Sequence, residues 1–322
     1  MLRPFRRSSG ICWCLIPSWR CPRQSGKALS DKFTIPFDRV VVLGSTGFLG
    51  KKVCDVFRQS GVDIIGLRSK DVDLRKEASI AALQQLAGGD VALIFSSALT
   101  PDRGQTLGTL SDNLTMAINV GKFLESCKIG LCVNISSDAV YPLTANPITE
   151  NSPIDPAGYY GLAKYGGEKI LERVTAASKI DFLNLRVTAL YGPGDPHGSY
   201  GPNSFLKSLM KDKTVRLFGA GEEKRDHLHV DDAVFLIRKL MAVRATGTYN
   251  LATGRSRSFS DIVTALQQAV PFSFEVVSMA RRGPITHRHF DTTRLCLQVP
   301  GFQFASIEEG IAGYYRFCFP GT

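Results

Sequence analysis

The sequence predicts an α/β protein with a doubly wound parallel sheet and a smaller C-terminal lobe. Apolar runs of strand length alternate with stretches of helical periodicity through the first half of the chain. A glycine-rich turn joins the first apolar run to the first helical stretch. With 322 residues, of which 44% are apolar and 21% are charged, the chain can bury a large core. We therefore expect a sheet domain in residues 38–190, followed by a lobe in residues 191–322 from which segments return to the sheet domain.

The N-terminal residues 1–37 form a separate basic segment. Six of the ten net positive charges lie in residues 1–30, which contain no acid. Pro4, Pro17 and Pro22 interrupt this stretch, so no clean amphipathic helix is expected. We interpret the segment as an extension without regular structure on a cytoplasmic protein. The alternative is a mitochondrial transit peptide, which is typically rich in Arg and poor in acids.

Composition excludes several classes of function. The chain beyond the N-terminal segment is only mildly basic, which argues against nucleic-acid binding and favours anionic substrates. No apolar run approaches the roughly 20 residues of a transmembrane helix. The pair Cys12-x-Cys14 lacks the paired CxxC spacing of a zinc site. We therefore expect no nucleic-acid partner, no membrane span and no metal centre.

The first strand, turn and helix together form a dinucleotide-binding motif. The apolar run 40–43 is the strand, and a helical pattern follows the glycines. Gly44 allows a tight turn, Gly47 lets the backbone approach a pyrophosphate, and Gly50 lets the helix pack close to the strand. The helix N-terminus would face the anion; the alternative is a plain strand–helix corner. The predicted cofactor contacts in this motif are Gly44, Thr46, Gly47, Phe48, Leu49 and Gly50.

The end of the second strand carries the information on which dinucleotide binds. The strand at 62–67 is followed by Arg68, and no acid follows until Asp71. In a Rossmann-type domain an acid at this place binds the 2′-hydroxyl of the adenosine ribose, whereas a basic residue accommodates a 2′-phosphate. The cofactor is therefore predicted to be NAD(P), with NADP favoured over NAD; a solvated basic loop is the alternative. Asp73 and Leu74 are expected at the adenine edge.

Two more buried strands complete the predicted Rossmann-type sheet. Residues 90–98 and 130–136 are nearly continuous apolar runs, as expected for parallel strands covered on both faces. Ligands of such sheets bind at the carboxyl ends of the strands. Ser97 and Ala98 are therefore predicted to contact the cofactor, and Ser137 ends the fourth strand at the same edge.

At this point the chain resembles a known family, the extended short-chain dehydrogenase/reductases, in their group of nucleotide-sugar epimerases and dehydratases. The resemblance runs from Val40 almost to the C-terminus. Each motif is modest, but their order and spacing together are specific. The matching segments are GSTGFLG, SSDAVY, ITENSPIDPAGYYGLAKYGGE, LRVTALYGPGD, RDHLHVDDA, YNLATG, RRGP and SIEEGI.

The segment YYGLAKYGGEK contains the spacing Tyr-x-x-x-Lys twice. The family pattern Tyr-Gly-x-Ser/Ala-Lys-x-x-Gly-Glu selects Tyr160 and Lys164. Tyr165 is five residues further and is rotated by about 140° around the helix, so the two tyrosines cannot face one substrate. We expect Tyr165 to pack against a neighbour and Lys169 to point to solvent.

The resemblance implies a role for each of these side chains. Tyr160 would be the general acid/base, and Lys164 would stabilise its phenolate and hold the nicotinamide ribose. Ser137 would hydrogen-bond the reacting oxygen, and Asn113 would support the helix and a water chain. Substrate contacts are implied for Asp138, Asn203, Arg225 and Arg282, with the two arginines at the diphosphate of a nucleotide sugar. The lobe at 191–322 would bind that substrate, and a homodimer is expected by analogy.

Departures from the family pattern narrow the predicted reaction. Dehydratases of this family follow the Ser/Thr position with Asp-Glu, but here Asp138 is followed by Ala139. Related epimerase-reductases carry a cysteine at that place, which is also absent, and His197 is a weaker candidate for an acid. The resemblance thus favours a nucleotide-sugar epimerase that acts by transient hydride transfer. The alternatives are an NADPH-dependent keto-sugar-nucleotide reductase, which Arg68 favours, and a dinucleotide-sensing protein without turnover.

Overall fold

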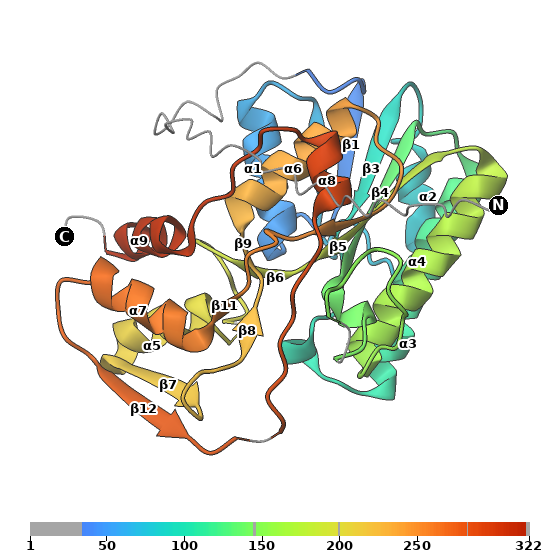
Figure 1. Ribbon diagram of the computed structural model, residues 1–322. Helices are drawn as coiled ribbons and strands as arrows, with labels where there is room; N and C mark the ends of the chain where they lie inside the picture. Colours follow the sequence, from blue (N-terminus) through green and yellow to red (C-terminus); the bar gives the residue numbers. More distant parts are fainter. Residues whose placement is uncertain (1–33, 144–145, 199, 282, 320–322) are drawn as a thin grey trace, which may run out of the picture. The chain divides into compact units, whose positions relative to one another are not determined.

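The structure is a computed structural model that describes residues 34–143, 146–198, 200–281 and 283–319 (Figure 1). The expected extension or targeting segment lies outside the described residues except for its last four positions. Of these, Ile35 and Phe37 are buried in the core beside the sheet. The folded core therefore begins at least three residues before Asp38, the expected start of the sheet domain.

A six-stranded parallel sheet forms the centre of the molecule and confirms the predicted fold class. The chain leaves β1 for β2 on one side and then crosses to β3 on the other side of β1. The carboxyl ends of β1 and β3 therefore flank a topological switch point, where ligands of such sheets bind. In spatial order the strands are β2 (Ile64–Leu67), β1 (Arg39–Leu43), β3 (Val91–Phe95), β4 (Leu131–Ser137), β5 (Asp181–Val187) and β10 (Gly247–Leu251).

Helices cover both faces of this sheet, because its strands are apolar on both sides (Figure 1). One face packs against α1 (Phe48–Gln59), α6 (Val230–Ala242) and α8 (Thr293–Gln298). The other face packs against α2 (Ala81–Gln84), α3 (Leu107–Ser126) and α4 (Tyr159–Ser178). Short 3₁₀ helices lie at Glu77–Ile80 (η1), Pro101–Arg103 (η2) and Asp138–Val140 (η3).

The C-terminal part of the chain forms a smaller lobe with a hydrophobic core of its own. Its α7 and α9 begin with capping boxes, Ser258 with Asp261 and Ser306 with Glu309, which satisfy the free backbone N–H groups of the first turn. The lobe's helices are α5 (Pro202–Asp212), α7 (Phe259–Ala269) and α9 (Ile307–Cys318). Its short strands pair as β7 (Thr214–Phe218) with β12 (Glu275–Met279), β8 (Lys224–Arg225) with β11 (Arg257–Ser258), and β6 (Ala189–Tyr191) with β9 (His227–His229).

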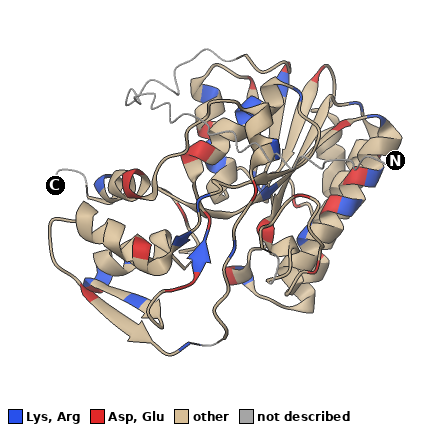
Figure 2. Cartoon of the chain, viewed as in Figure 1, with Lys and Arg blue, Asp and Glu red and all other residues tan. Residues whose placement is uncertain are grey.

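Acidic and basic residues are scattered over many elements in the view of Figure 2, and β8 is a short basic strand. Among the described residues, no helix combines the length and the apolar character that are needed to cross a membrane.

Candidate active site

A cavity of about 580 Å³ opens at the carboxyl ends of the sheet strands. Leu43, Leu67 and Ser137, which end β1, β2 and β4, line it directly. Of the predicted cofactor contacts, only Gly50 lies outside the lining. The predicted contacts that line the cavity are Gly44, Thr46, Gly47, Phe48, Leu49, Arg68, Asp73, Leu74, Ser97, Ala98, Tyr160 and Lys164.

The glycine turn brings its backbone close to the strand end and to α1. At Gly44 and Gly50 an added Cβ would clash with neighbouring backbone atoms, so a side chain there would disrupt the turn that can hold a pyrophosphate. Gly44 has a φ of 90°, and a Cβ there would lie 2.8 Å from the Ser97 nitrogen. A Cβ on Gly50 would lie 2.3 Å from the Gly44 carbonyl oxygen, so Gly50 permits the close packing of α1 on the turn. Gly47 caps α1 without a side chain, and the first turn of α1 contains no acid. The residues present therefore fit a dinucleotide phosphate.

The tip of β2 carries two exposed ion pairs. Arg68 donates from Nε and Nη2 to the two carboxylate oxygens of Asp71, at 2.9 Å each. Those hydrogen bonds lower the pKa of Asp71 to about 2. Arg75 binds Asp73 in the same two-pronged way, at 3.0 Å for both bonds. Arg68 thus faces the cavity as predicted for a 2′-phosphate ligand, but with its guanidinium already paired.

Tyr160 and Lys164 lie one above the other on α4 and both face the cavity. The Lys164 Nζ is 5.9 Å from the centroid of the Tyr160 ring and donates to the carbonyl oxygen of Ile135 at 2.7 Å. Ser137 lines the same cavity and lies close enough to Tyr160 to act on the pKa of its phenol. The structure therefore brings together the three side chains that the family resemblance implied.

The protein's own groups hold Tyr160 as a neutral phenol. Burial raises the pKa of Tyr160 to about 12, the charge of Asp138 adds to the rise, and the hydrogen bond with Ser137 opposes it. Burial also lowers the pKa of Lys164 to about 8, against the opposing effect of Glu168. The expectation that Lys164 lowers the pKa of Tyr160 is thus not met by the protein alone, because desolvation disfavours both charged forms.

Tyr165 and Lys169 behave as expected for the second, non-catalytic pair. Tyr165 packs against the small core cluster around Val140 and does not line the cavity. Lys169 lies near the Tyr165 ring and forms an exposed ion pair with Glu172 at 2.7 Å. The register of α4 thus places the two tyrosines in different surroundings, with Tyr160 at the cavity and Tyr165 at the small core cluster.

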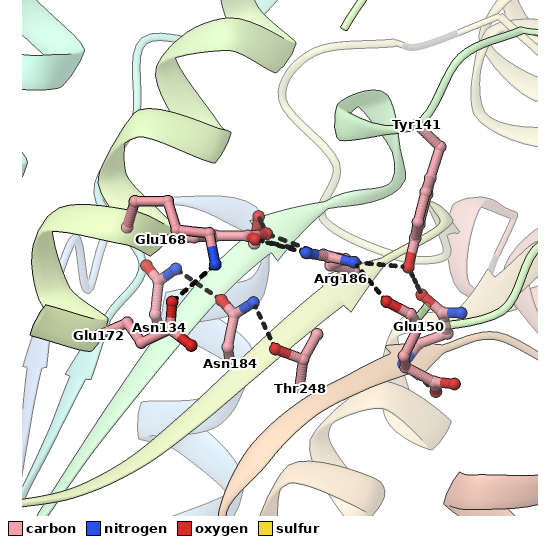
Figure 3. A network of polar contacts seen from close by, with 11 residues as sticks. Asn134, Tyr141, Glu150, Glu168, Glu172, Asn184, Arg186 and Thr248 are labelled. Atoms are coloured by element: carbon pink, nitrogen blue, oxygen red, sulfur yellow. Dashed lines mark hydrogen bonds and ion pairs between the residues drawn. The ribbon is translucent and has the colours of Figure 1, made fainter. Parts of the chain in front are cut away.

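A buried polar network anchors α4 to the sheet (Figure 3). Glu168, one turn beyond Lys164, accepts hydrogen bonds from Nε and Nη2 of Arg186 on β5, the shorter at 2.8 Å. Ser136 also donates to Glu168. Arg186 in turn donates to the hydroxyl of Tyr141 at 2.9 Å. Glu168 and Arg186 are only 3% and 6% exposed, so this ion pair is shielded from water.

Asn113 supports the cavity from α3 rather than facing a ligand. Its side-chain oxygen accepts from the Leu99 nitrogen at 2.8 Å, and its amide nitrogen donates to the Leu99 carbonyl at 3.0 Å. These two hydrogen bonds to the backbone of Leu99 hold the loop after β3, where Ala98 and Leu99 line the cavity. Asn113 thus holds this loop, and its expected support of the helix and a water chain stays a prediction.

The four predicted substrate contacts are not among the described residues that line the cavity. Asp138 is paired with Arg288, and Arg225 donates to the carbonyl and hydroxyl oxygens of Thr286. Asn203 accepts from the Gly192 nitrogen and donates to the Leu190 carbonyl, so it holds the loop after β6. Arg282 lies outside the described residues.

The C-terminal lobe supplies one side of the cavity through the glycine- and proline-rich loop between β6 and α5. Asp195, Pro196 and His197 of this loop line the cavity. Sequence reasoning named His197 only as a weak candidate for an acid and did not assign Asp195 or Pro196. The ring of His197 contacts a carboxylate oxygen of Asp102 at 2.9 Å, which closes the loop onto η2. The signal for these residues was the irregular segment itself, because such loops commonly cover ligands. Val187 and Thr188, at the end of β5, could have been found from the strand-end rule.

Comparison with known proteins is consistent with this geometry. The model of the NAD dependent epimerase/dehydratase family matches residues 40–252. The chain is 25% identical to the UDP-glucose 4-epimerase of Mycolicibacterium smegmatis, covering 87% of this chain and 98% of that protein. It is also 25% identical to the GDP-L-fucose synthase of Azorhizobium caulinodans, covering 88% and 97%. The crystal structure of UDP-glucose 4-epimerase with UDP-glucose from Thermotoga maritima superimposes with a TM-score of 0.77 at 22% identity, over 87% of this chain and 98% of that one.

Proposed function

Because the chain belongs to the NAD dependent epimerase/dehydratase family, we propose that it is a nucleotide-sugar 4-epimerase acting through Ser137, Tyr160 and Lys164. The observation that carries this proposal is the meeting of these three side chains with the glycine turn in one cavity. A plain dinucleotide-binding protein would need the glycine turn but not a Tyr, Lys and Ser at its nicotinamide end. UDP-glucose 4-epimerases among the similar proteins support the choice of substrate class.

In the proposed reaction each of the three side chains has one task. Tyr160 takes the proton from a sugar hydroxyl and later returns it to the keto oxygen, and Ser137 holds that oxygen in place. Lys164 binds the ribose next to the nicotinamide and adds positive charge beside Tyr160. A nicotinamide cofactor, held by the glycine turn and Lys164, would supply hydride transfer and a further positive charge beside Tyr160. Arg225 is proposed to hold the diphosphate of the substrate while the keto sugar rotates within the site.

A 4-epimerase needs no carboxyl pair beside the serine, and the Asp-Glu pair of a dehydratase is not present at positions 138 and 139. Ala139 lacks the carboxyl group that would follow Asp138 in a dehydratase, and Asp138 is occupied by Arg288. The side chains that remain at the cavity can transfer a proton at one hydroxyl and return it.

We also infer a homodimer through α3 and α4, since both helices leave large apolar side chains such as Ile118 and Leu162 exposed.

The epimerase proposal predicts interconversion of sugar nucleotides without net consumption of cofactor. Purified protein incubated with UDP-glucose, UDP-galactose and their GDP counterparts should form the C4 epimer with no added reduced cofactor. The products are separated by chromatography, while near-ultraviolet absorbance reports reduced nicotinamide. Stoichiometric oxidation of NADPH by a keto-sugar nucleotide, with no interconversion of the parent sugars, would refute the epimerase and support the reductase. Failure of both assays despite tight cofactor binding would favour the dinucleotide sensor.

The reductase remains a second candidate because of the cavity beside Arg68. A second cavity of about 410 Å³ lies between α1 and the end of β2, and its charged lining residues are Lys51, Arg58, Arg68 and Asp55, the last paired with Arg58 at 3.7 Å. The excess of cations at this place would suit the 2′-phosphate of NADP, the cofactor that reductases consume and replace at every turnover. The exposed pair of Arg68 with Asp71 is a weak competitor, since exposed ion pairs contribute little stability.

Replacing Arg68 by Asp should weaken NADPH binding by at least tenfold and leave NADH binding within about threefold. The change removes a charge-assisted contact and adds repulsion against the 2′-phosphate, a loss of more than about 1.4 kcal/mol. Fluorescence titration with both cofactors measures it. Lys70→Asp is the matched control, because Lys70 is exposed and lines neither cavity. Equal loss for the two cofactors, or for the two variants, would mean that Arg68 does not read the 2′-phosphate.

A further inference from the structure

The chain between β12 and α8 returns from the lobe to the sheet domain and brings a buried arginine to the active site. Arg288 donates from its backbone nitrogen to the carbonyl of Lys224 on β8, at 3.1 Å. One residue later, the His289 carbonyl accepts from the Ile148 nitrogen at 2.7 Å, on the loop beyond η3. Phe290 then pairs with Ile148 in a parallel bridge. The backbone on both sides of Arg288 is thus held between the lobe and the sheet domain.

The Arg288 side chain binds the residue that follows Ser137. Its Nε lies 3.2 Å from a carboxylate oxygen of Asp138, and its Nη2 donates to the Asp138 backbone carbonyl at 2.7 Å. Ser137 joins the same turn, since its hydroxyl accepts from the Ala139 nitrogen at 3.1 Å and lies 3.4 Å from Asp138. Arg288 is only 5% exposed, so its charge is shielded and directed at this one partner.

The charge of Asp138 reaches Tyr160. It raises the pKa of the phenol, in the same direction as burial and the more distant carboxylate of Asp102. Burial also raises the pKa of Asp138 itself, and this rise is opposed first by the charge of Arg288, then by the hydrogen bond with Ser137 and the charge of Arg225. Lys164 is a cation beside Tyr160 on the same helix. Arg288 is the cation that acts most strongly on the negative charge one residue from Ser137, ahead of Arg225.

We propose that Arg288 is a positioning residue of the reaction, which holds the Ser137–Ala139 turn beside Tyr160 and cancels the negative charge of Asp138 there. The idea rests on the proposed function of Tyr160 as the acid/base. With both partners present, the Arg288–Asp138 pair contributes no net charge. Loss of Arg288 alone leaves a negative charge beside the phenol, loss of Asp138 alone leaves a positive one, and loss of both restores neutrality.

A four-enzyme cycle tests this role: wild type, Arg288→Met, Asp138→Asn and the double variant. Each is titrated in the presence of oxidised nicotinamide cofactor, and the phenolate of Tyr160 is followed as the near-ultraviolet difference from the same enzyme carrying Tyr160→Phe. The midpoint should rise by roughly one pH unit in Arg288→Met and fall by roughly one unit in Asp138→Asn. The double variant should return to within a few tenths of a unit of wild type.

The outcomes separate an electrostatic role from a merely structural one. A structural role would lower the temperature of unfolding, measured on the same samples, without moving the midpoints in opposite directions. Four coincident midpoints, or a double variant that stays displaced, would overturn the proposal. If Arg288→Met does not fold, Asp138→Asn decides alone, because absence of a downward shift in that variant refutes the idea. The titration needs no turnover, so shifted midpoints in a protein that epimerises no sugar nucleotide would refute the proposed function and leave the role of Arg288 intact.

Discussion

Tyr160→Phe is expected to lower the turnover of sugar nucleotides by two to four orders of magnitude, about the size of general acid/base catalysis. The change removes one oxygen atom from a side chain that lines the cavity beside Ser137 and Lys164. Affinity for the cofactor should change by less than about threefold, because the glycine turn and the tip of β2 hold most of the dinucleotide. Steady-state kinetics and a cofactor titration on the same preparation measure the two effects separately.

The matched control for this variant is Tyr165→Phe, which makes the same chemical change five residues further along α4. Tyr165 packs against the cluster around Val140, away from the cavity, so turnover should stay within about threefold of wild type. Exchange of the two results would show that the second Tyr-x-x-x-Lys pair is the chemical one. Equal, small effects in both variants would remove Tyr160 from the mechanism.

Glu168→Gln is expected to lower the free energy of unfolding by about 3 kcal/mol or more. It leaves the guanidinium of Arg186 buried and without a counter-charge, and breaking a buried ion pair from one side costs about 3–5 kcal/mol. The hydrogen bonds that Glu168 accepts from Ser136 and Arg186 are weakened at the same time (Figure 3). Urea denaturation followed by circular dichroism measures the change, with the dependence on urea concentration checked against wild type.

Glu172→Gln is the control for this second variant, with the same chemical change one turn further along the same helix. Glu172 pairs with Lys169 at an exposed site, where such pairs contribute less than about 1 kcal/mol. A loss of stability of similar size in both variants would mean that burial of the Glu168–Arg186 pair is unimportant. Because α4 also carries Tyr160 and Lys164, we expect Glu168→Gln to lower turnover under conditions where it remains folded.

The family resemblance is confirmed by the match of the family model, and the parallel sheet is confirmed by the structure. Both were accessible from sequence because they depend on local signals. Apolar runs such as 91–95 cannot be placed anywhere but in a covered strand, and the glycines at 44, 47 and 50 describe a turn that other residues cannot form. The strand ends could also be predicted from local sequence. Ser97 and Ser137 were placed at the cavity because they lie where the apolar runs stop.

The choice of Tyr160 as the candidate acid/base was also accessible from sequence, but only through the family pattern and the geometry of one helix. A rotation of about 140° between Tyr160 and Tyr165 is a property of any α-helix. Once the pattern selects Tyr160, Lys164 must lie on the same face. The structure agrees, because one pair lines the cavity and the other faces a small core cluster and solvent.

Only the tertiary structure decided which charges act on these side chains. Arg288 is 150 residues from Asp138 in the sequence, and Glu168 is 18 residues from Arg186, on a different element. No local pattern reports such pairs, because they form where a strand, a helix and a returning segment happen to meet. The same is true of the pKa of Tyr160, which burial raises to about 12 in the protein without its cofactor. The sequence by itself determined the fold, the cofactor turn and the candidate Tyr and Lys, all of which follow from neighbours along the chain. Burial and charge depend on neighbours in space, and those are settled only when the chain has folded.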